Sequence, residues 1–560
     1  MPLESFNYTG VRLLESMFKE QVRSTRDAFF DVSNDSYLFG FRQRAGLPAP
    51  GVGLDGWYGS DTFHTFGQYL AGMARIAKAT NDKPLADKAI CLMHEWGKTI
   101  EHDGYFYYSR KPNFYHYSYE KTVGGLNDIY EYLGEKDALV YLDRITDWAI
   151  KNLDRSRPTP GPTPPFQYTG DAGEWYTLGE NLYRAYLLTG DEKYRKFAAV
   201  WHYDKFWDGF ADGKPNVSYL HAYSHVNSLS SAAMAYEITG EPHYLKVITN
   251  AQDYIHRTQC FATGGYGPSE RLRPTDGALG KALESEDATF ETPCGSWAVF
   301  KLTRYLQHFT GEAHYGDWME QLTYNGIGSA LPMLASGQTF YDSDYRTCGS
   351  IKPYFHLHWP CCSGTYPQDV ADYHNNIYLK SPEALYVNLF IPSEVTWNHR
   401  GQDILIRQET SYPVDGYVTL TVIPEHAVEF PLNFRVPGWV KKPVAVKVNG
   451  AVESVAVQPC AWATIRRSWK AGNKVELQIP LELALVPVDP QHPKRVAVTR
   501  GPVVLVRKGQ GPALDHLALS DWKETGKGSL DFSASVQPII ELVPFYQMTK
   551  DTAYLMYFDL

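Results

Sequence analysis

Residues 186–198 read YLLTGDEKYRKFA, and the same pattern returns as YEITGEPHYLKVI at 236–248 and as QHFTGEAHYGDWM at 307–319. In each copy an apolar helix end is followed by Thr-Gly, an acidic residue and a tyrosine. Glycine at the end of a helical pattern indicates a C-cap, and an acidic residue directly after it favours the start of another helix. Each repeat therefore predicts a helical hairpin.

Degenerate copies of this pattern occur at YLGEKD (132–137) and ATNDK (79–83). The helices expected before the turns have long apolar faces, which suits an inner ring of helices packed against an outer ring. Five such hairpins, with a sixth from flanking helices, predict an (α/α)6 toroid over residues 1–372. The segments that enter the inner helices carry polar and aromatic residues and should meet at one mouth: 57–64, 116–120, 174–176, 221–225 and 270–294.

The pattern changes after about residue 375 to short β-branched or alternating runs, such as YVTLTVIP and KVELQIPL. Turn residues, including Asn449-Gly450, separate these runs, as in a β-sandwich. We therefore expect a β-sandwich domain over 373–505 and a C-terminal segment, 506–560, that packs on the sandwich or on the toroid. No low-complexity linker divides the two halves, which favours tight packing between them.

Composition limits the function classes. The chain has 560 residues, a formal charge of -10 and no basic block, so nucleic acid is not expected as a partner. No apolar run is long enough to cross a membrane, and MPLESFNYTG lacks the charged start and apolar core of a signal peptide. We expect a cytoplasmic protein, or a periplasmic one if a leader has been removed, and a homodimer is left open. The 40 tyrosines and 14 tryptophans fit a carbohydrate cleft, because sugar faces stack on aromatic rings.

The vicinal pair Cys361-Cys362, in HWPCCSGTYPQD, is the strongest chemical signal. Adjacent cysteines bridge each other only with strain, whereas three thiolates and one carboxylate can close a tetrahedral zinc site. Cys294 and Glu291, in FETPC, would supply the remaining ligands of such a Zn²⁺ site. Cys91 and Cys460 are expected to be buried core thiols.

These motifs resemble glycoside hydrolase family 127, the β-L-arabinofuranosidases, and the related family 146. The resemblance rests on FETPCGS (290–296), WPCCSG (359–364), TGGYGPSERL (263–272) and, in the sandwich, FRVPGW (434–439). It implies a zinc site made of Glu291, Cys294, Cys361 and Cys362. It further implies Cys361 as the nucleophile and Glu270 as the general acid/base.

Some positions depart from the family pattern. Pro293 is inserted, so the first motif reads Glu-x-x-Cys, and Glu270 lies 21 positions before Glu291. The resemblance extends to the substrate pocket, where it implies sugar contacts from His225 and Tyr341, and Glu180 stands where the family has another sugar ligand. His64, Trp175 and His358 complete the expected substrate-binding residues, because they lie in segments that enter the inner helices or lead into the cysteine pair.

The expected reaction is retaining hydrolysis of a glycoside by an exo-acting enzyme, through a thioglycosyl intermediate on Cys361. Two other classes remain open. A polysaccharide lyase could use the same architecture, with a structural zinc site and with Arg271, Arg273 and Arg346 to bind a uronate. Hydrolysis of a different sugar is a variant of the retaining hydrolysis described above. A carbohydrate-binding protein without turnover is the third class.

Overall fold

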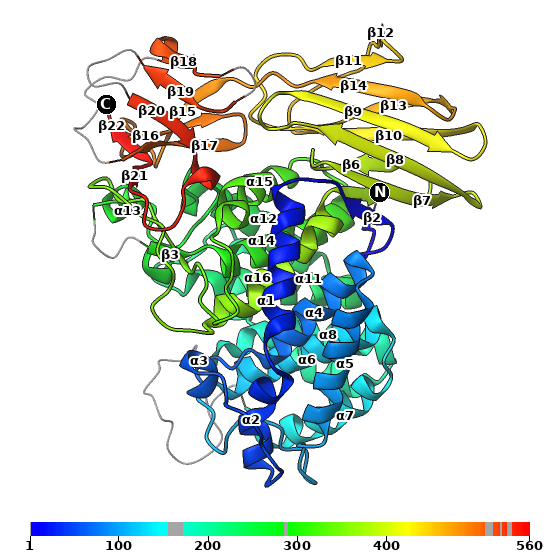
Figure 1. Ribbon diagram of the computed structural model, residues 1–560, viewed down its shortest axis with the longest axis vertical. Coiled ribbons are helices and arrows are strands. Elements are labelled where there is room, and N and C mark those ends of the chain that lie inside the picture. Colours follow the sequence, from blue (N-terminus) through cyan, green and yellow to red (C-terminus); the bar gives the residue numbers. More distant parts are fainter. Residues whose placement is uncertain (1, 155–171, 285–288, 510–518, 527–528, 535–539) are drawn as a thin grey trace.

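The computed structural model describes residues 2–154, 172–284, 289–509, 519–526, 529–534 and 540–560; the side chains of 172 and 289–291 lie outside this description. Helices make up most of the first two thirds of the described chain, and strands make up most of the rest (Figure 1). The predicted combination of a helical domain and a strand-rich domain is therefore confirmed.

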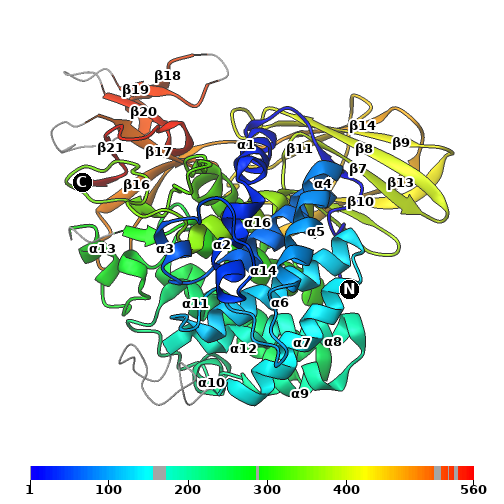
Figure 2. The ribbon, with the colours of Figure 1, turned by 60° about the horizontal axis from the view of Figure 1, so that its bottom comes forward.

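Six helices form a closed inner ring, because each packs against the next and the last packs against the first (Figure 2). In ring order they are α4 (Phe66–Thr80), α6 (Tyr115–Leu133), α8 (Leu178–Thr189), α11 (Ala222–Thr239), α14 (Pro293–Thr310) and α16 (Cys361–Asn376). Most residues of these helices are buried, as an inner ring requires.

Outer helices cover the ring and pack against its members. They are α1 (Met17–Asp31), α5 (Lys83–Gly97), α7 (Asp137–Asn152), α9 (Glu192–Val200), α12 (Pro242–Gln259) and α15 (Gly316–Gln321). Shorter or flanking helices are α2 (Asn34–Arg44), α3 (Gly56–Gly59), α10 (Asp204–Ala211) and α13 (Ala278–Ala282). The two layers give the (α/α)6 arrangement that the repeats predict.

The Thr-Gly turns end the inner helices as expected. Gly190, Gly240 and Gly311 adopt left-handed φ values of 72°, 68° and 75°, and each donates its N–H to a carbonyl four residues back. The preceding threonine hydroxyl bonds a carbonyl of the same helix, and its oxygen also accepts the N–H of the acidic residue that follows; for Thr189 these distances are 2.7 and 3.2 Å. Each repeat is thus a hydrogen-bonded stop between two helices.

Glycine permits a close contact between two helices of the ring. A Cβ built on Gly67 of α4 would lie 2.2 Å from the carbonyl oxygen of Lys121, and one on Gly125 of α6 would lie 2.3 Å from that of Gly67. No side chain fits at either position, so the backbones of α4 and α6 touch directly. This contact fixes the spacing of two helices whose N-terminal ends border the pocket described below.

Two sheets, the first mixed and the second antiparallel, form the β-sandwich above the helical domain (Figure 1). The first has the order β1 (Glu4–Ser5), β5 (Tyr378–Lys380), β6 (Leu385–Val387), β10 (Val428–Val436), β13 (Ala461–Trp469), with β6 and β10 parallel. The second has the order β12 (Ala451–Val452), β11 (Ala445–Val448), β14 (Asn473–Gln478), β9 (Tyr417–Pro424), β8 (Gln402–Thr410), β7 (Ser393–His399), β2 (Val11–Leu13). The chain's first residues thus contribute an edge strand to each sheet.

A third sheet follows the sandwich. Its order is β15 (Leu483–Pro487), β16 (Arg495–Arg500), β17 (Val503–Lys508), β20 (Ile540–Pro544), β19 (Phe532–Ala534), β18 (Trp522–Glu524), while β21 (Tyr554–Leu555) pairs with β17 and β22 (Tyr557–Asp559) with β16. It begins before residue 505, so residues 483–505 belong with the C-terminal segment rather than with the sandwich. Backbone bridges from Ser350 to Tyr554 and from Lys352 to Lys550 join it to the helical domain.

A buried charge network joins sandwich and helices. Arg435 of β10 is fully buried and pairs with Asp317 and, at 2.9 Å, with Glu320, both on α15. Glu320 also accepts hydrogen bonds from Tyr412 and Trp439 at 2.8 and 3.0 Å. Removing one member would leave a buried charge without its partner, which is strongly destabilising. The expected tight packing between the halves therefore has a specific basis.

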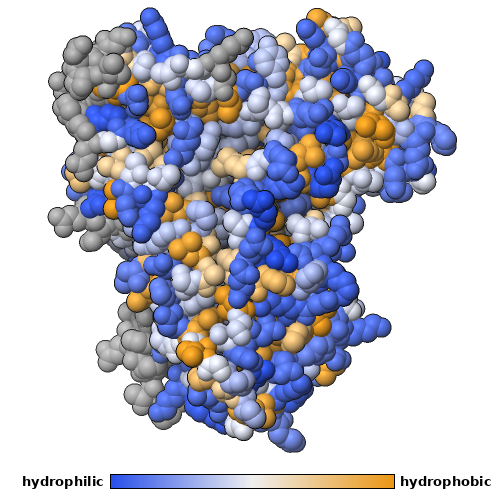
Figure 3. Space-filling model, in the orientation of Figure 1, coloured by the Kyte–Doolittle hydropathy of each residue, from blue (hydrophilic) through white to orange (hydrophobic). Residues whose placement is uncertain are grey.

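The surface is mixed in character. Figure 3 shows hydrophilic side chains over most of one face, with apolar residues in small separate groups. Among the described helices, none has both the length and the hydropathy that a membrane crossing requires.

The expectation for Cys91 and Cys460 is wrong, because both thiol side chains are exposed. Cys91 lies on the outward face of an outer helix, and Cys460 lies in a turn at φ 64°.

Candidate active site

A pocket of about 370 Å³ opens where the inner helices begin. This volume lies within the range of small-molecule sites, roughly 300–1,000 Å³. Aromatic rings, carboxylates and imidazoles line it together with one cysteine: Trp57, Phe63, Phe114, Tyr117, Gly173, Glu174, Tyr176, Tyr219, Leu220, His221, Tyr223, His225, Glu270, Arg271, Tyr341 and Cys361. The sequence-based expectation that helix entrances meet at one mouth is therefore correct.

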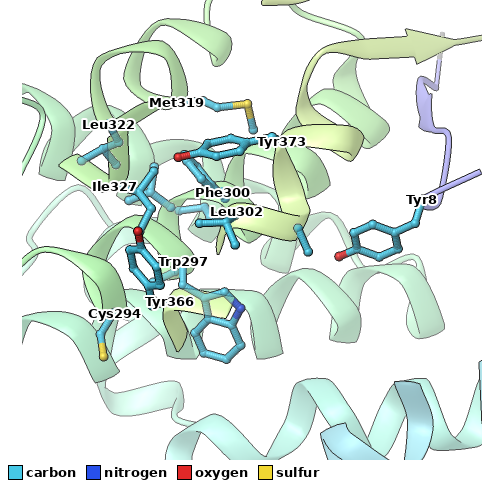
Figure 4. Close-up of a cluster of buried hydrophobic side chains, with 14 of the residues drawn as sticks. Tyr8, Cys294, Trp297, Phe300, Leu302, Met319, Leu322, Ile327, Tyr366 and Tyr373 are labelled. Atoms are coloured by element: carbon cyan, nitrogen blue, oxygen red, sulfur yellow. The ribbon is translucent and has the colours of Figure 1, made fainter. Parts of the chain in front are cut away.

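Three thiols gather at one wall of the pocket. The Cys294 sulfur lies 3.6 Å from that of Cys361 and 3.2 Å from that of Cys362, and all three side chains are buried. Cys294 lies in the first turn of α14, and the pair opens α16. Both helix N-termini favour negative charge, which suits thiolates. Figure 4 shows Cys294 beside the buried aromatic rings of Trp297 and Tyr366 from the same two helices.

This thiol cluster fits a soft metal ion. The three sulfurs lie within 4.8 Å of one another. Thiolates that share a tetrahedral zinc ion at about 2.3 Å are about 3.8 Å apart, close to the two separations above. The Thr365 hydroxyl, 3.1 Å from the Cys294 sulfur, is a nearby hydrogen-bonding group.

Glu291, the fourth ligand expected, ends strand β3 (Thr289–Glu291), and its side chain lies outside the described part of the structure. Its backbone pairs with Asp342 at the start of β4 (Asp342–Asp344). The next residue, Thr292, donates its N–H to the Tyr341 carbonyl at 3.2 Å. The strand pair thus brings the backbone of Glu291 beside Tyr341, while Cys294 follows three positions later.

Tyr341 connects the cysteine with the candidate acid. Its hydroxyl donates to Glu270 Oε1 at 2.5 Å and lies 3.6 Å from the Cys361 sulfur. The ring stacks on Phe355, with centroids 4.4 Å apart, so its position is fixed. A single hydroxyl therefore touches both groups that the resemblance implies for catalysis.

His221 lies between two carboxylates. Its Nε2 is 3.5 Å from Glu270 Oε2 and its Nδ1 is 3.8 Å from Glu174 Oε1. Nδ1 accepts the Ser224 N–H as the cap of α11, which places the proton of the neutral ring on Nε2, toward Glu270. Glu174 and Glu270 both adopt left-handed backbone angles, with φ of 54° and 57°. Strain of this kind is concentrated at functional sites.

The pKa of Glu270 reflects opposing effects. Burial raises the pKa of this carboxyl, but His221, the Tyr341 hydroxyl and Arg271 together outweigh burial and hold the pKa below its usual value. In the free protein Glu270 is therefore a well-stabilised carboxylate.

His225 presents an acceptor to the pocket. Burial lowers its pKa to about 3, so the ring is neutral. Its Nδ1 lies 2.8 Å from the His221 carbonyl oxygen and therefore carries the proton, while the buried Nε2 has no hydrogen-bond partner among the described residues. A ligand hydroxyl could satisfy this nitrogen.

The remaining residues expected to bind substrate do not line the pocket. Glu180 pairs with Lys301 and accepts from Tyr305 at 3.1 Å inside the helical barrel. His64 stacks on Tyr108 with ring centroids 4.6 Å apart. Trp175 packs against Tyr203, and the His358 ring lies 2.9 Å from a carboxylate oxygen of Asp55.

Neighbours of these residues lie in the pocket instead. Phe63 takes the place expected for His64, and Glu174 and Tyr176 take the place expected for Trp175. The sequence signal marked the correct segments. It could not show which side chain of each segment faces inward.

Fold and pocket together define a class, an (α/α)6 barrel with a β-sandwich, an aromatic and carboxylate-lined pocket and a buried thiol cluster. Residues 10–375 match the family profile of the β-L-arabinofuranosidase GH127 catalytic domain, and residues 384–481 match that of the GH127 middle domain. The chain therefore belongs to the GH127 family of glycoside hydrolases. A comparison with curated protein sequences gives no match.

Solved structures share the fold over the full length. A GH127 β-L-arabinofuranosidase from Geobacillus stearothermophilus T6 is 21% identical with a TM-score of 0.77, covering 98% of this chain and 100% of that one. A second solved structure, that of a GH127 β-arabinofuranosidase, is 20% identical with a TM-score of 0.77, covering 100% of this chain and 98% of that one.

Proposed function

We propose that the chain is a retaining, exo-acting β-L-arabinofuranosidase with Cys361 as nucleophile and Glu270 as general acid/base. The observation that carries this proposal is the Tyr341 hydroxyl, which lies 2.5 Å from Glu270 and 3.6 Å from the Cys361 sulfur at the wall of one pocket. Both groups also line the pocket, so a sugar bound there would contact both. Retaining glycosidases need one nucleophile and one acid/base in such an arrangement.

The first step forms a bond from the Cys361 sulfur to the anomeric carbon and breaks the bond from that carbon to the leaving oxygen. Glu270 gives its proton to that oxygen. In the second step Glu270 takes a proton from water, whose oxygen displaces the sulfur. Two displacements at one carbon retain its configuration.

Zn²⁺ would be held by Cys294, Cys361 and Cys362, with Glu291 as the fourth ligand, and when bound it keeps its thiol ligands deprotonated. The close approach of the three sulfurs supports this assignment. Cys294 and Cys362 are fully buried and Cys361 is 6% exposed, so Cys361 is the member that lines the pocket.

Substrate binding would prepare Glu270 for its role as an acid. The side chain is 35% exposed in the free protein. A sugar that fills the pocket removes this contact with water, which disfavours the carboxylate and raises the pKa of the carboxyl. Tyr341 and His225 would bind sugar hydroxyls, the latter through its open Nε2.

The lyase alternative receives less support from the pocket. Of the three arginines that could bind a uronate, only Arg271 lines it. Arg346 pairs with Asp344 at 2.8 Å, and Arg273 donates to the Pro268 carbonyl at 2.9 Å.

The decisive experiment measures release of an aryl group from an aryl β-L-arabinofuranoside by the zinc-loaded wild type, Cys361→Ala and Cys348→Ala. Cys348 is an exposed thiol and serves as the matched control. We expect turnover in the wild type and the control, and a loss of about a thousandfold or more in Cys361→Ala. NMR should show a product of retained configuration; an inverted product, or turnover that survives in Cys361→Ala, would remove Cys361 from the nucleophile's role. If the wild type were inactive, the result would favour hydrolysis of a glycoside of another sugar, or the lyase reaction.

A further inference from the structure

The pocket is closed at one end and open at the other. Near the thiols its lining is buried, with Cys361 at 6% and Tyr223 at 2% exposure. At the other end Tyr219 is 61% exposed and Arg271 is also exposed. Both exposed residues still line the pocket, so they form its rim.

The backbone of Tyr219 is held in an unfavourable conformation. Its φ is 62°, in the left-handed region that a bulky residue rarely adopts. Its N–H donates to the Leu272 carbonyl at 2.8 Å, and the N–H of Leu272 donates to the Leu220 carbonyl at 2.9 Å. A further backbone bridge joins His221 and Arg271. These bonds tie Tyr219 to the segment that directly follows Glu270.

The ring of Tyr219 also has a fixed neighbour. The Arg273 guanidinium carbon lies 5.8 Å from the ring centroid, and that guanidinium is anchored by its bond to the Pro268 carbonyl. The ring nevertheless remains mostly in water. Backbone strain concentrates at functional sites, and here it holds an aromatic ring at the rim of the pocket, which points to a role in binding.

The position of Tyr219 relative to Glu270 indicates which part of the substrate binds at the rim. If Glu270 protonates the glycosidic oxygen, the sugar that is cleaved off occupies the closed end of the pocket. The leaving group must then extend past Glu270 toward the open rim, where Tyr219 and Arg271 lie. An aromatic face stacks on the C–H face of a sugar, and a neighbouring guanidinium donates to its hydroxyls.

We infer that Tyr219 is the stacking platform for a sugar on the leaving-group side of the cleaved bond, with Arg271 beside it as a hydroxyl donor. The inference rests on the proposed function and extends it, because it selects glycosides whose leaving group is itself a sugar. Tyr219 thus determines specificity.

The test compares two substrates, methyl β-L-arabinofuranoside and a disaccharide in which β-L-arabinofuranose is linked to a second arabinose. Tyr219→Asn removes the ring while asparagine tolerates the left-handed backbone, and Tyr219→Phe is the matched control that keeps the ring. The quantity measured is the ratio of kcat/KM for the disaccharide to that for the methyl glycoside. We expect this ratio to fall about tenfold in Tyr219→Asn and to remain near the wild-type ratio in Tyr219→Phe, as expected for one lost stacking contact.

Each outcome decides between the hypotheses. A ratio in Tyr219→Asn equal to that of the wild type overturns the platform, as does a wild type that cleaves the methyl glycoside but not the disaccharide. A fall of the same size in Tyr219→Phe overturns stacking, since the ring is still present. A folded wild type that cleaves neither substrate refutes the proposed function itself and this inference with it.

Discussion

Replacing Tyr341 by Phe should move the pH dependence of catalysis. The substitution removes the hydroxyl that donates to Glu270 and leaves the ring stacked on Phe355. A hydrogen bond to a charged group contributes about 1.5–3 kcal/mol. Because the Glu270 side chain is 35% exposed, the lower end of that range applies. About 1.4 kcal/mol corresponds to one pKa unit.

The sign follows from which form of Glu270 is stabilised. The Tyr341 hydroxyl stabilises the carboxylate and lowers its pKa, so its removal raises the pKa. A general acid must be protonated, and the limb of kcat/KM that declines toward high pH reports loss of its proton in the free enzyme. In Tyr341→Phe this limb should therefore move to higher pH, by about one unit.

The assay records kcat/KM from about pH 3 to about pH 7 for an alkyl β-L-arabinofuranoside, whose leaving group needs protonation, because the wild-type limb lies below the usual pKa of a glutamate. Tyr345→Phe is a suitable control, because Tyr345 is also buried but donates to Thr263, at 3.0 Å, rather than to a pocket carboxylate. The reasoning is refuted if the limb stays in place or moves to lower pH in Tyr341→Phe while both variants fold.

Three further predictions concern the metal, the barrel and acid stability. Cys294→Ser should weaken zinc affinity by more than the roughly 10–100-fold typical of groups that only orient a ligand, measured as zinc retained against a chelator; unchanged retention contradicts the site. Lys301→Met leaves Glu180 buried without its ion pair and should cost about 3–5 kcal/mol in urea unfolding, most of it recovered by adding Glu180→Gln. Burial lowers the pKa of His64 to about 3, so only the unfolded state takes up this proton as the pH falls below 6.5. His64→Phe should thus reduce the loss of stability between pH 7 and pH 5 by about 2 kcal/mol, and an unchanged loss would show that His64 is protonated in the fold.

The architecture was predictable because its signals are local. A Thr-Gly stop ends its own helix through hydrogen bonds from the αL glycine and the threonine hydroxyl to carbonyls of that helix, so it needs no distant partner. The limits of the sandwich were harder to predict. The strands of the third sheet have the same alternating composition as those of the sandwich, and only long-range pairing separates them.

Which individual residues face the pocket depends on backbone conformations that could not be predicted from the sequence. Phe63 and Glu174 adopt left-handed φ values of 45° and 54°, which turn the chain at these two positions. The turns determine whether Phe63 or His64, and whether Trp175 or its neighbours, face the pocket. Glu180 lies one turn too deep along its helix and meets Lys301. The grouping of Cys294 with Cys361 is confirmed; it was predicted from the ligand set of a tetrahedral zinc site and from the family resemblance, because no local pattern relates such distant segments.

The edge strands supplied by the N-terminus have a consequence for biosynthesis. β2 pairs with β7, whose residues leave the ribosome roughly 380 positions later, and at about 5–20 residues per second this takes roughly 20–75 s. During that interval the first strands have no partner, while the helical repeats between them can already form. Closure of both sandwich sheets must therefore follow formation of the helical repeats, and a fusion partner placed before β1 would stay tethered to two unpaired sheet edges until β5 and β7 have been synthesised.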